Sequence, residues 1–427
     1  MKKIIALLLV LVMSFSLVAC GGAEEKTEAP AANAGEAAPA APAENAEPVA
    51  ITLKVWAPQA DQVDENSWLN VMLPKFEEAH PEYVITWDIG VCGEGDAAGI
   101  VKNDPAAAAD IFLYANDQMG TLIEAGALAK LGGSYLEQVQ NDVAQTYIDT
   151  VTYTDGGVYG FPMAPNTWFM WYNKEIFTEE DVKNLNTMLE KGIVSFPMNN
   201  SWYTSTFFFG VGGTCFGPQG IDAAAGIDFS SDLCVEAAKF MVEFAAHPNF
   251  RNDADGIGVA GMKEGAIHAM FSGPWDRPEL EASLGENLGC VVLPTFTMNG
   301  TDYQMKSFAG SKAIGVNPNA KNPKAAMQLA AFLATPEAQP ARYELSAITP
   351  AATACAENEA VKANFVVVTE ALEMANATVA QPTIAQMGGY WDPVKAFGDG
   401  ILNGDVTVEN AAEKLAATME LLNSSGL

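Results

Sequence analysis

Positive charge is scarce in this sequence. Its 427 residues include 22 Lys and Arg against 53 Asp and Glu, for a formal net charge of -31, and the only arginines are Arg251, Arg277 and Arg342. Nucleic-acid phosphates require clustered Lys and Arg, and small anions favour the forked guanidinium of arginine. The composition therefore argues against a nucleic-acid partner and favours a neutral or cationic ligand.

Motifs of common enzyme classes are also missing. The sequence contains no HExxH, CxxC, GxSxG or Walker A motif, and no GxGxxG after a predicted strand. The three histidines, His80, His247 and His268, fall on two helix ends and a strand, where capping or surface roles are expected. Carboxylate pairs such as Glu94 and Asp96 occur by chance in so acidic a chain, so they are weak evidence for glycosidase chemistry. We therefore predict no catalytic residue, no metal site and no cofactor.

Cysteine has no pattern that indicates a structural role. Beyond Cys20, the sequence has an odd number of widely spaced cysteines: Cys92, Cys215, Cys234, Cys290 and Cys355. This spacing fits neither a zinc site nor a disulfide framework. We predict that they are small buried hydrophobic residues, although a single disulfide stays open.

The N-terminus has the pattern of a secretory leader. Two lysines after Met1 and a short apolar run predict a signal peptide over residues 1–19, too short to span a membrane. Leu17-Val18-Ala19-Cys20 resembles the bacterial lipobox, which predicts lipid attachment at Cys20; the alternative is a plain signal with an incidental cysteine. Residues 20–48 are rich in Ala, Glu and Pro, which predicts a disordered tether. We therefore expect a lipid-anchored protein at the extracellular face of the cell membrane.

The first part of the remaining chain has the pattern of a parallel sheet covered by helices. Ile51, Leu53 and Val55 alternate with polar residues, as in a strand with one buried face. Expected elements follow in order: a helix over 67–79 broken or kinked at Pro74, strands over 83–89 and 110–114, and a helix over 118–131. Such βαβ units form mostly parallel sheets, which bind ligands beyond the carboxyl ends of their strands. Tyr114 and Asp117 lie at one such end.

The length of the chain fits two lobes, and two stretches are candidates for crossings between them. Strands are expected at 158–163 and 167–172, joined by Ala164-Pro165-Asn166, where the proline forces an extended link. This is a hinge candidate; the alternative is an ordinary connection inside one lobe. The extended segment 307–316 could cross back. Further strands are expected at 267–272 and 289–293, and helices at 235–247, 324–334, 336–345, 365–375 and 407–422.

Three aromatic clusters lie in polar, turn-like surroundings. They are Trp202-Tyr203, Trp275-Asp276 and Tyr390-Trp391. An aromatic face stacks on the C–H face of a sugar ring while neighbouring amides and carboxylates bond its hydroxyl groups. Any one Trp is more often a core residue, but three such clusters favour a carbohydrate site.

From about Ile51 onward the chain resembles the extracellular solute-binding lipoproteins of ABC sugar importers (solute-binding protein family 1), and in particular maltose- and maltodextrin-binding proteins. The resemblance is carried by several segments: Ala109 to Leu131, Tyr172-Asn173-Lys174, Gly265 to Trp275, Val292 to Phe296, Ile384 to Met387, and Tyr390-Trp391. It implies an α/β fold of the two-lobed, periplasmic-binding-protein-like (type II) kind, a clamp with discontinuous lobes and a hinge. Lobe one would comprise 49–163 plus 312–364, and lobe two 166–309 plus 365–427.

The resemblance also implies the ligand-binding residues. Trp275 and Trp391 match the stacking tryptophans, Asp117 a hydroxyl-binding aspartate, and Gln118 a position where arginine is common. Asn166 and Asn200 stand where the best-known branch has glutamates. The remaining expected contacts are Tyr114, Trp202, Tyr203, Asp276 and Tyr390. No lysine near residues 59–65 matches the usual sugar-binding one, which leaves the sugar open.

The resulting functional hypothesis is a protein without enzymatic activity that binds carbohydrate, with malto-oligosaccharide favoured, and delivers it to an ABC transporter permease by closing its cleft. We expect a monomer whose partners are the oligosaccharide, the permease subunits and, through its lipid, the membrane. Alternatives are a binding protein for another oligosaccharide or for peptides or polyamines, and a secreted glycan-cleaving enzyme.

Overall fold

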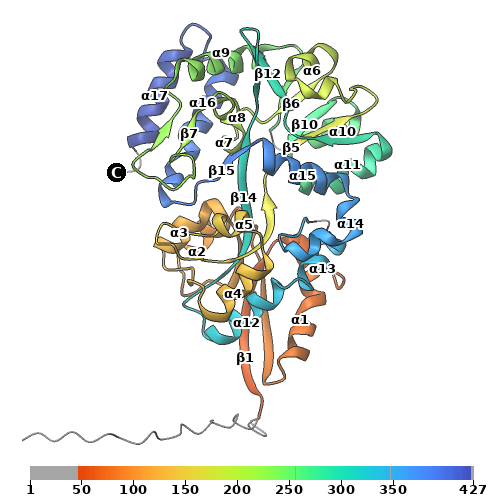
Figure 1. The fold of residues 1–427 in the computed structure, drawn as a ribbon, viewed down its shortest axis with the longest axis vertical. Helices are drawn as coiled ribbons and strands as arrows, with labels where there is room; N and C mark the ends of the chain where they lie inside the picture. Colours follow the sequence, from red (N-terminus) through yellow and green to blue (C-terminus); the bar gives the residue numbers. More distant parts are fainter. Residues whose placement is uncertain (1–46, 255, 347, 425–427) are drawn as a thin grey trace, which may run out of the picture. The chain divides into compact units, whose positions relative to one another are not determined.

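The computed structural model describes residues 47–254, 256–346 and 348–424. The predicted signal peptide, Cys20 and the tether up to residue 46 lie outside these residues. In the described part, buried hydrophobic side chains form three clusters. One belongs to a first group of helices and strands and two belong to a second group, and these groups define two lobes (Figure 1). None of the helices in these ranges has the length and apolar character needed to cross a membrane.

The sheet of lobe one is mainly parallel, as predicted. Strand β1 (Val49–Ala57) lies between β2 (Tyr83–Val91) and β3 (Ile111–Ala115) and is parallel to both. Strand β14 (Ser307–Val316) is antiparallel to β3 and to β4 (Phe161–Asn166). On β1, every second side chain from Leu53 to Ala57 is fully buried, which explains the alternation in the sequence.

The helices of lobe one are mostly short. They are α1 (Trp68–Ala79), α2 (Ala97–Val101), α3 (Met119–Glu124), α4 (Gly133–Asp142), α5 (Gln145–Thr150), α12 (Pro323–Leu333), α13 (Ala338–Ser346) and α14 (Glu359–Lys362). Contrary to the predicted break, α1 continues through Pro74, because its buried Trp68, Leu73 and Phe76 hold it against the core. Helix α3 ends well before Leu131, since Gly126 adopts a left-handed conformation with φ of 68°.

Lobe two is built on a second, mixed sheet. Strand β5 (Phe169–Asn173) lies between β11 (Leu288–Val291) and β10 (Ala269–Ser272) and is antiparallel to both. Strand β6 (Val194–Phe196) pairs with β10 and is parallel to it, and β9 (Phe250–Asn252) pairs with β6, also in parallel. Two small hairpin-like pairs are separate: β12 (Thr295–Met298) with β13 (Thr301–Gln304), and β7 (Thr214–Cys215) with β8 (Ile227–Asp228).

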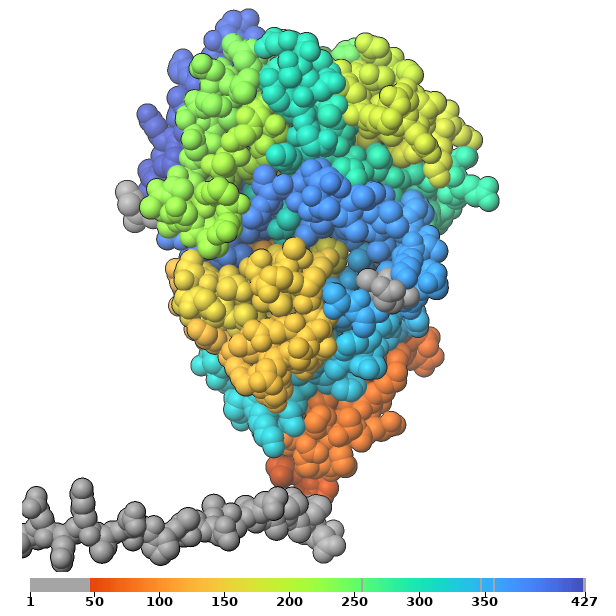
Figure 2. Space-filling view, viewed as in Figure 1, coloured from red at the N-terminus to blue at the C-terminus, as the bar shows by residue number. Residues whose placement is uncertain are grey.

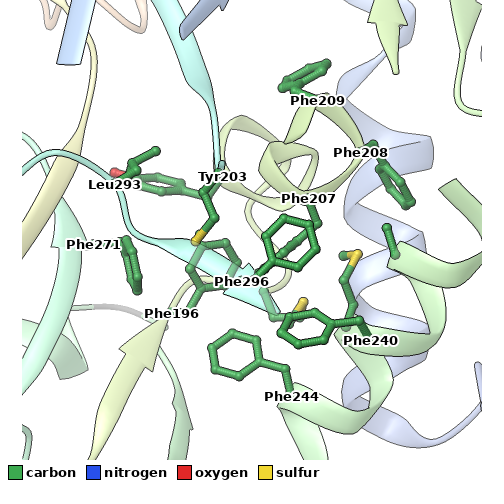
Figure 3. Close-up of a cluster of buried hydrophobic side chains, with 14 of the residues drawn as sticks. Phe196, Tyr203, Phe207, Phe208, Phe209, Phe240, Phe244, Phe271, Leu293 and Phe296 are labelled. Carbon is green, nitrogen blue, oxygen red and sulfur yellow. The ribbon is translucent and has the colours of Figure 1, made fainter. Parts of the chain in front are cut away.

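The helices of lobe two are α6 (Leu185–Lys191), α7 (Ser201–Thr204), α8 (Thr206–Gly210), α9 (Asp232–Ala246), α10 (Ile257–Glu264), α11 (Arg277–Leu284), α15 (Phe365–Asn376), α16 (Trp391–Asn403) and α17 (Ala411–Ser424). Helix α16 was not predicted. The core of lobe two is rich in phenylalanine (Figure 3). The ring centroid of Phe207 lies 5.3 Å from that of Phe296 and 5.7 Å from that of Phe240. The first of these pairs is edge-to-face and the second is tilted, and aromatic pairs at such separations add to the stability gained by burial. The aromatic stretch after Phe196 therefore serves mainly the core.

The chain crosses between the lobes along two neighbouring strands. It leaves the first sheet at Asn166, the end of β4, and enters the second at Phe169, the start of β5. The predicted hinge segment therefore connects the lobes and is not a link inside one of them. Strand β14 crosses as well, because its Phe308 is buried in the core of lobe two and its Ile314 in that of lobe one.

Helix α15 follows the third predicted crossing, at Asn364. Asn364 precedes it and its side chain accepts a hydrogen bond of 3.0 Å from the N–H of Val366. Figure 2 shows the blue segment that contains α15 at the surface, beside the yellow-orange segment with α4 and α5. On its inner face lies Glu373, which accepts hydrogen bonds from Ser307 and from the N–H of Leu293; burial raises its pKa to about 8.

The five cysteines of the described chain are all free, and four of them are buried. Only Cys290 is partly exposed, and its thiol donates to Thr369 over 3.3 Å. Four of the five thus fit the prediction of small buried hydrophobic residues, Cys290 is only partly buried, and no disulfide joins the five in this structure. The lobe boundaries at 163/166, 309/312 and 364/365 stay a prediction.

Candidate ligand-binding cleft

A cavity of about 680 Å³ is lined by residues of both lobes and of the crossing strands. Its lining residues are Glu94, Gly95, Ala98, Gly99, Lys102, Ala115, Asp117, Gln118, Thr121, Asn166, Asn200, Trp202, Lys312, Gly388 and Trp391. Several of them follow the carboxyl ends of β2 and β3, where ligands bind in open α/β sheets. The volume lies within the range of small-molecule sites, about 300–1,000 Å³.

Asp117 supplies a carboxylate to the lobe-one wall. It lies in a short 3-10 turn (Asn116–Gln118) directly after β3, so the end of the strand sets its position. Burial raises the pKa of Asp117 to about 6, and its own backbone N–H opposes this shift. The side chain is therefore ionised at neutral pH but carries a cost of desolvation, which hydroxyl donors of a ligand would reduce.

Gln118 also lines the cleft, but its side chain is already engaged. Its Oε1 accepts a 2.6 Å hydrogen bond from the N–H of Ala98, and its Nε2 donates to the carbonyl of Gly95. Gln118 thus anchors the loop before α2. A charged arginine, common at this position in the resembling family, would lack the acceptor that bonds Ala98.

The charges at the floor of the cleft are largely paired. Arg342 is buried and forms a two-pronged ion pair with Asp61, with N–O distances of 3.1 and 2.7 Å, and also contacts Glu94 at 3.1 Å. Lys312 lies 3.9 Å from the same carboxylate of Glu94. Burial raises the pKa of Glu94, but Lys312 and Arg342 outweigh it and hold the pKa below its usual value. The cleft therefore presents little net charge to a ligand.

Two amides and two indoles complete the wall. Asn166 ends β4, and Asn200 caps α7, where its side chain accepts a 3.1 Å hydrogen bond from the N–H of Trp202. Trp391 is the first residue of α16, and its carbonyl accepts a hydrogen bond from Ser201. Both Trp202 and Trp391 are half-buried, so part of each ring faces the cavity.

Trp275 lies beside the cavity without lining it. Its side chain is 43% exposed, and its ring lies 5.9 Å from that of Trp202, tilted by 33°. The ammonium of Lys312 lies 5.6 Å from the centroid of the Trp275 ring. Asp276, the residue after Trp275, accepts a hydrogen bond from Ser272 and does not line the cavity. Trp275 is thus placed to extend the stacking surface.

The three predicted tyrosines do not line the cleft. Tyr114 and Tyr390 are fully buried, and Tyr203 is 7% exposed against Trp168. The hydroxyl of Tyr114 donates to the carbonyl of Tyr159, and that of Tyr390 to Ser201 and Ser205. The hydroxyl groups of Tyr114 and Tyr390 are therefore satisfied inside a core, and a direct ligand contact by any of the three tyrosines would require the core to open.

Several lining residues were not among the predicted ligand contacts, above all Glu94, Lys102 and Lys312. Lys312 lies in the crossing segment that was predicted, and the alternation of that strand could have placed it toward the cleft. No group of three or more His, Cys, Asp or Glu side chains with metal-binding geometry occurs in the part of the chain that the structure describes.

Two α/β lobes joined by continuous strands, with a ligand-sized cleft between them, define a clamp-like solute-binding protein. Residues 72–366 match the model of the family described as Bacterial extracellular solute-binding protein. The chain therefore belongs to that family, and the predicted family and two-lobed fold class are confirmed.

Similar proteins bind oligosaccharides. The galactooligosaccharide-binding protein of Bacillus subtilis (strain 168) is 25% identical, with 98% of this chain and 96% of that protein covered. A maltooligosaccharide ABC transporter solute-binding lipoprotein of Streptococcus pneumoniae (strain ATCC BAA-255 / R6) is 26% identical, covering 74% and 78%. A solved structure with acarbose is 43% identical, with a TM-score of 0.85 over 88% of this chain and 99% of that one.

Proposed function

We propose that this protein binds malto-oligosaccharides in the cleft and delivers them to an ABC transporter permease. The observation that carries the proposal is the cavity wall itself, in which Trp202 and Trp391 from lobe two share one space with Asp117 from lobe one and Asn166 from the crossing strand. Stacking rings and neutral or singly charged hydrogen-bonding groups are the set that a sugar requires. The 43% identical structure with acarbose supports this ligand class.

Charge argues in the same direction. The carboxylate of Glu94 is bound by Arg342 and approached by Lys312, so it is not free to pair with a cationic peptide or polyamine. Asn166 and Asn200 contribute amides, which bond hydroxyl groups from either side. A neutral, hydroxyl-rich ligand therefore fits this wall better than a charged one.

Calorimetric titration of residues 47–427 with maltose, maltotriose, maltotetraose and acarbose tests the proposal. We expect micromolar binding that tightens with chain length. Absence of heat with all four would refute it.

A matched pair of tryptophan variants locates the site. Trp391→Ala should weaken maltotriose binding by about 1–3 kcal/mol, as expected for a stacking residue at a ligand contact. Trp87→Ala removes a tryptophan from β2 that does not line the cavity, and its binding should equal that of the wild type. Equal losses of maltotriose affinity in the two variants would mean that the Trp391 ring affects binding only through the stability of the fold.

Galacto-oligosaccharide is the second candidate ligand, because the relative that covers 98% of this chain is named for it. The two sugars differ in the direction of their hydroxyl groups, which the amides of Asn166 and Asn200 would sense. Parallel titration with β-linked galacto-oligosaccharides separates the candidates. If only these sugars bind, the cleft remains the proposed site and galacto-oligosaccharide replaces malto-oligosaccharide as the proposed ligand.

We also propose that the protein leaves the sugar intact. The feature that favours hydrolysis is the pair Asp117 and Glu94, whose pKa values are shifted in opposite directions. Glu94, however, is held by Arg342, which leaves no free nucleophile beside Asp117. Overnight incubation with maltotetraose should yield no shorter product by chromatography, and appearance of maltose would refute this.

Delivery requires the protein at the cell surface. We propose that Cys20 carries the lipid anchor, that the protein is a monomer, and that closing of the lobes around sugar creates the form that the permease recognises. The Cys20→Ser variant should move from the membrane fraction to the medium. Light scattering of residues 47–427 should give the mass of one chain with and without sugar.

A further inference from the structure

Gln381 is a buried polar residue that the proposed function does not yet use. It follows β15 (Thr378–Ala380), the short strand parallel to the start of β14, and its side chain is 3% exposed. Its Oε1 accepts a 3.0 Å hydrogen bond from the indole Nε1 of Trp202. Its backbone N–H donates to the carbonyl of Ala309 on β14, also over 3.0 Å. Gln381 thus touches a cleft residue and a crossing strand.

Of the two polar atoms of the Gln381 side-chain amide, only the oxygen is hydrogen-bonded in the described structure. An indole N–H can only donate, so the bond to Trp202 fixes the oxygen toward the ring and the nitrogen away from it. Among the described residues, that Nε2 has no hydrogen-bond partner. A buried donor without a partner destabilises the folded state, so an apolar residue of similar length would suit the core better. The bond that it makes to Trp202 is the feature an apolar residue would lose.

Besides this hydrogen bond, the Trp202 ring packs against the core of lobe two and contacts two aromatic rings. It lies edge-on to Tyr203 with ring centroids 5.4 Å apart, and tilted toward the exposed Trp275 at 5.9 Å. Neither ring contact gives the indole N–H an acceptor. The hydrogen bond to Gln381 does, and it restricts the two side-chain torsions that decide which part of the ring faces the cavity.

We propose that Gln381 is a positioning residue that orients the indole of Trp202 for stacking on the sugar and ties this ring to the strand that crosses between the lobes. The inference rests on the proposed binding of sugar in the cleft. It predicts that removing the Gln381 amide lowers the affinity for sugar without lowering the stability of the fold.

The decisive variant is Gln381→Met, which keeps the length of the side chain and removes the acceptor. We expect maltotriose affinity to fall about three- to tenfold, the range of one lost hydrogen bond, while the unfolding midpoint stays equal or rises. Gln381→Glu, which keeps an acceptor oxygen for the indole N–H, should bind maltotriose more tightly than Gln381→Met does at the same pH. A loss of stability in Gln381→Met that accounts for the loss of binding would overturn the proposal.

A double-mutant cycle tests whether Gln381 acts through Trp202. Trp202→Phe keeps an aromatic ring but has no N–H, so adding Gln381→Met to it should change affinity less than twofold. An undiminished further loss would show that Gln381 acts by another route. Gln386→Met, five residues further along and outside the cavity lining, is the matched control and should bind as the wild type does.

A spectroscopic readout separates this proposal from the proposed function. The indole N–H resonance of Trp202, identified by its disappearance in Trp202→Phe, should shift upfield and exchange faster in Gln381→Met without any sugar present. If the wild type binds no sugar, the proposed function fails while this result still tests the positioning. An unchanged resonance would refute the positioning whether or not sugar binds.

Discussion

The affinity for sugar should fall as the pH falls through the pKa of Asp117. In the free protein, burial raises this pKa to about 6, so the carboxyl is about nine-tenths ionised at pH 7 and about one-tenth ionised at pH 5. A carboxylate accepts hydrogen bonds from sugar hydroxyl groups better than a carboxylic acid does. If only the ionised form binds well, maltotriose affinity drops about tenfold between these two pH values.

Titration calorimetry at half-unit steps between pH 5 and pH 7.5 measures this profile. Asp117→Asn should bind more weakly at pH 7 and show a flat profile, because the titrating group is gone. Glu370 is the control, since it is buried at the inner face of α15 with a pKa raised by burial to about 7 and does not line the cleft. Glu370→Gln should keep the tenfold drop. The reasoning is refuted if Asp117→Asn retains the wild-type profile or if affinity rises at low pH.

Three further predictions concern stability. Arg342→Met should lower the free energy of unfolding by about 3–5 kcal/mol in urea titrations, because it leaves the buried carboxylate of Asp61 without its partner; a loss below 1 kcal/mol would contradict this. Glu373 has a folded-state pKa of about 8, above its usual 4.5, so its contribution to stability is fully present below about pH 4.5 and is lost as the pH rises from there to about 8. Glu373→Gln should therefore flatten the decline of the thermal midpoint between about pH 5 and pH 8. Tyr114→Phe should cost about 0.5–1.5 kcal/mol of stability, for one hydrogen bond, and leave maltotriose affinity unchanged.

The elements that sequence analysis located well are those whose pattern is local. Strand β1 was predicted from side chains two residues apart, and the segment that forms β14 from its extended, glycine-punctuated sequence. Helix α16 was missed, because Gly388 and Gly389 just before Trp391 indicate a turn and hide the start of a helix. In the structure those glycines form a separate 3-10 turn (Ala385–Gly389), after which the helix begins.

The site was harder to predict than the fold, because its geometry depends on distant partners. The sequence shows Tyr390 and Trp391 as one aromatic pair, yet only Trp391 faces the cavity. The direction of Tyr390 is decided by Ser201 and Ser205, almost 190 positions earlier in the chain. Likewise, the ion pair that neutralises Glu94 comes from Arg342, and no local pattern connects the two.

Strand β14 restricts how the chain length can vary. Its first residues pair with β15 beside the core of lobe two, and its later residues pair with β3 and β4 in lobe one. An insertion or deletion of one residue between Ala309 and Lys312 would turn every later side chain to the opposite face of the sheet. Lys312 would then leave the cleft and the buried Ile314 would face outward. Variation in length among related chains is therefore expected in the surface loops of either lobe and not within this strand.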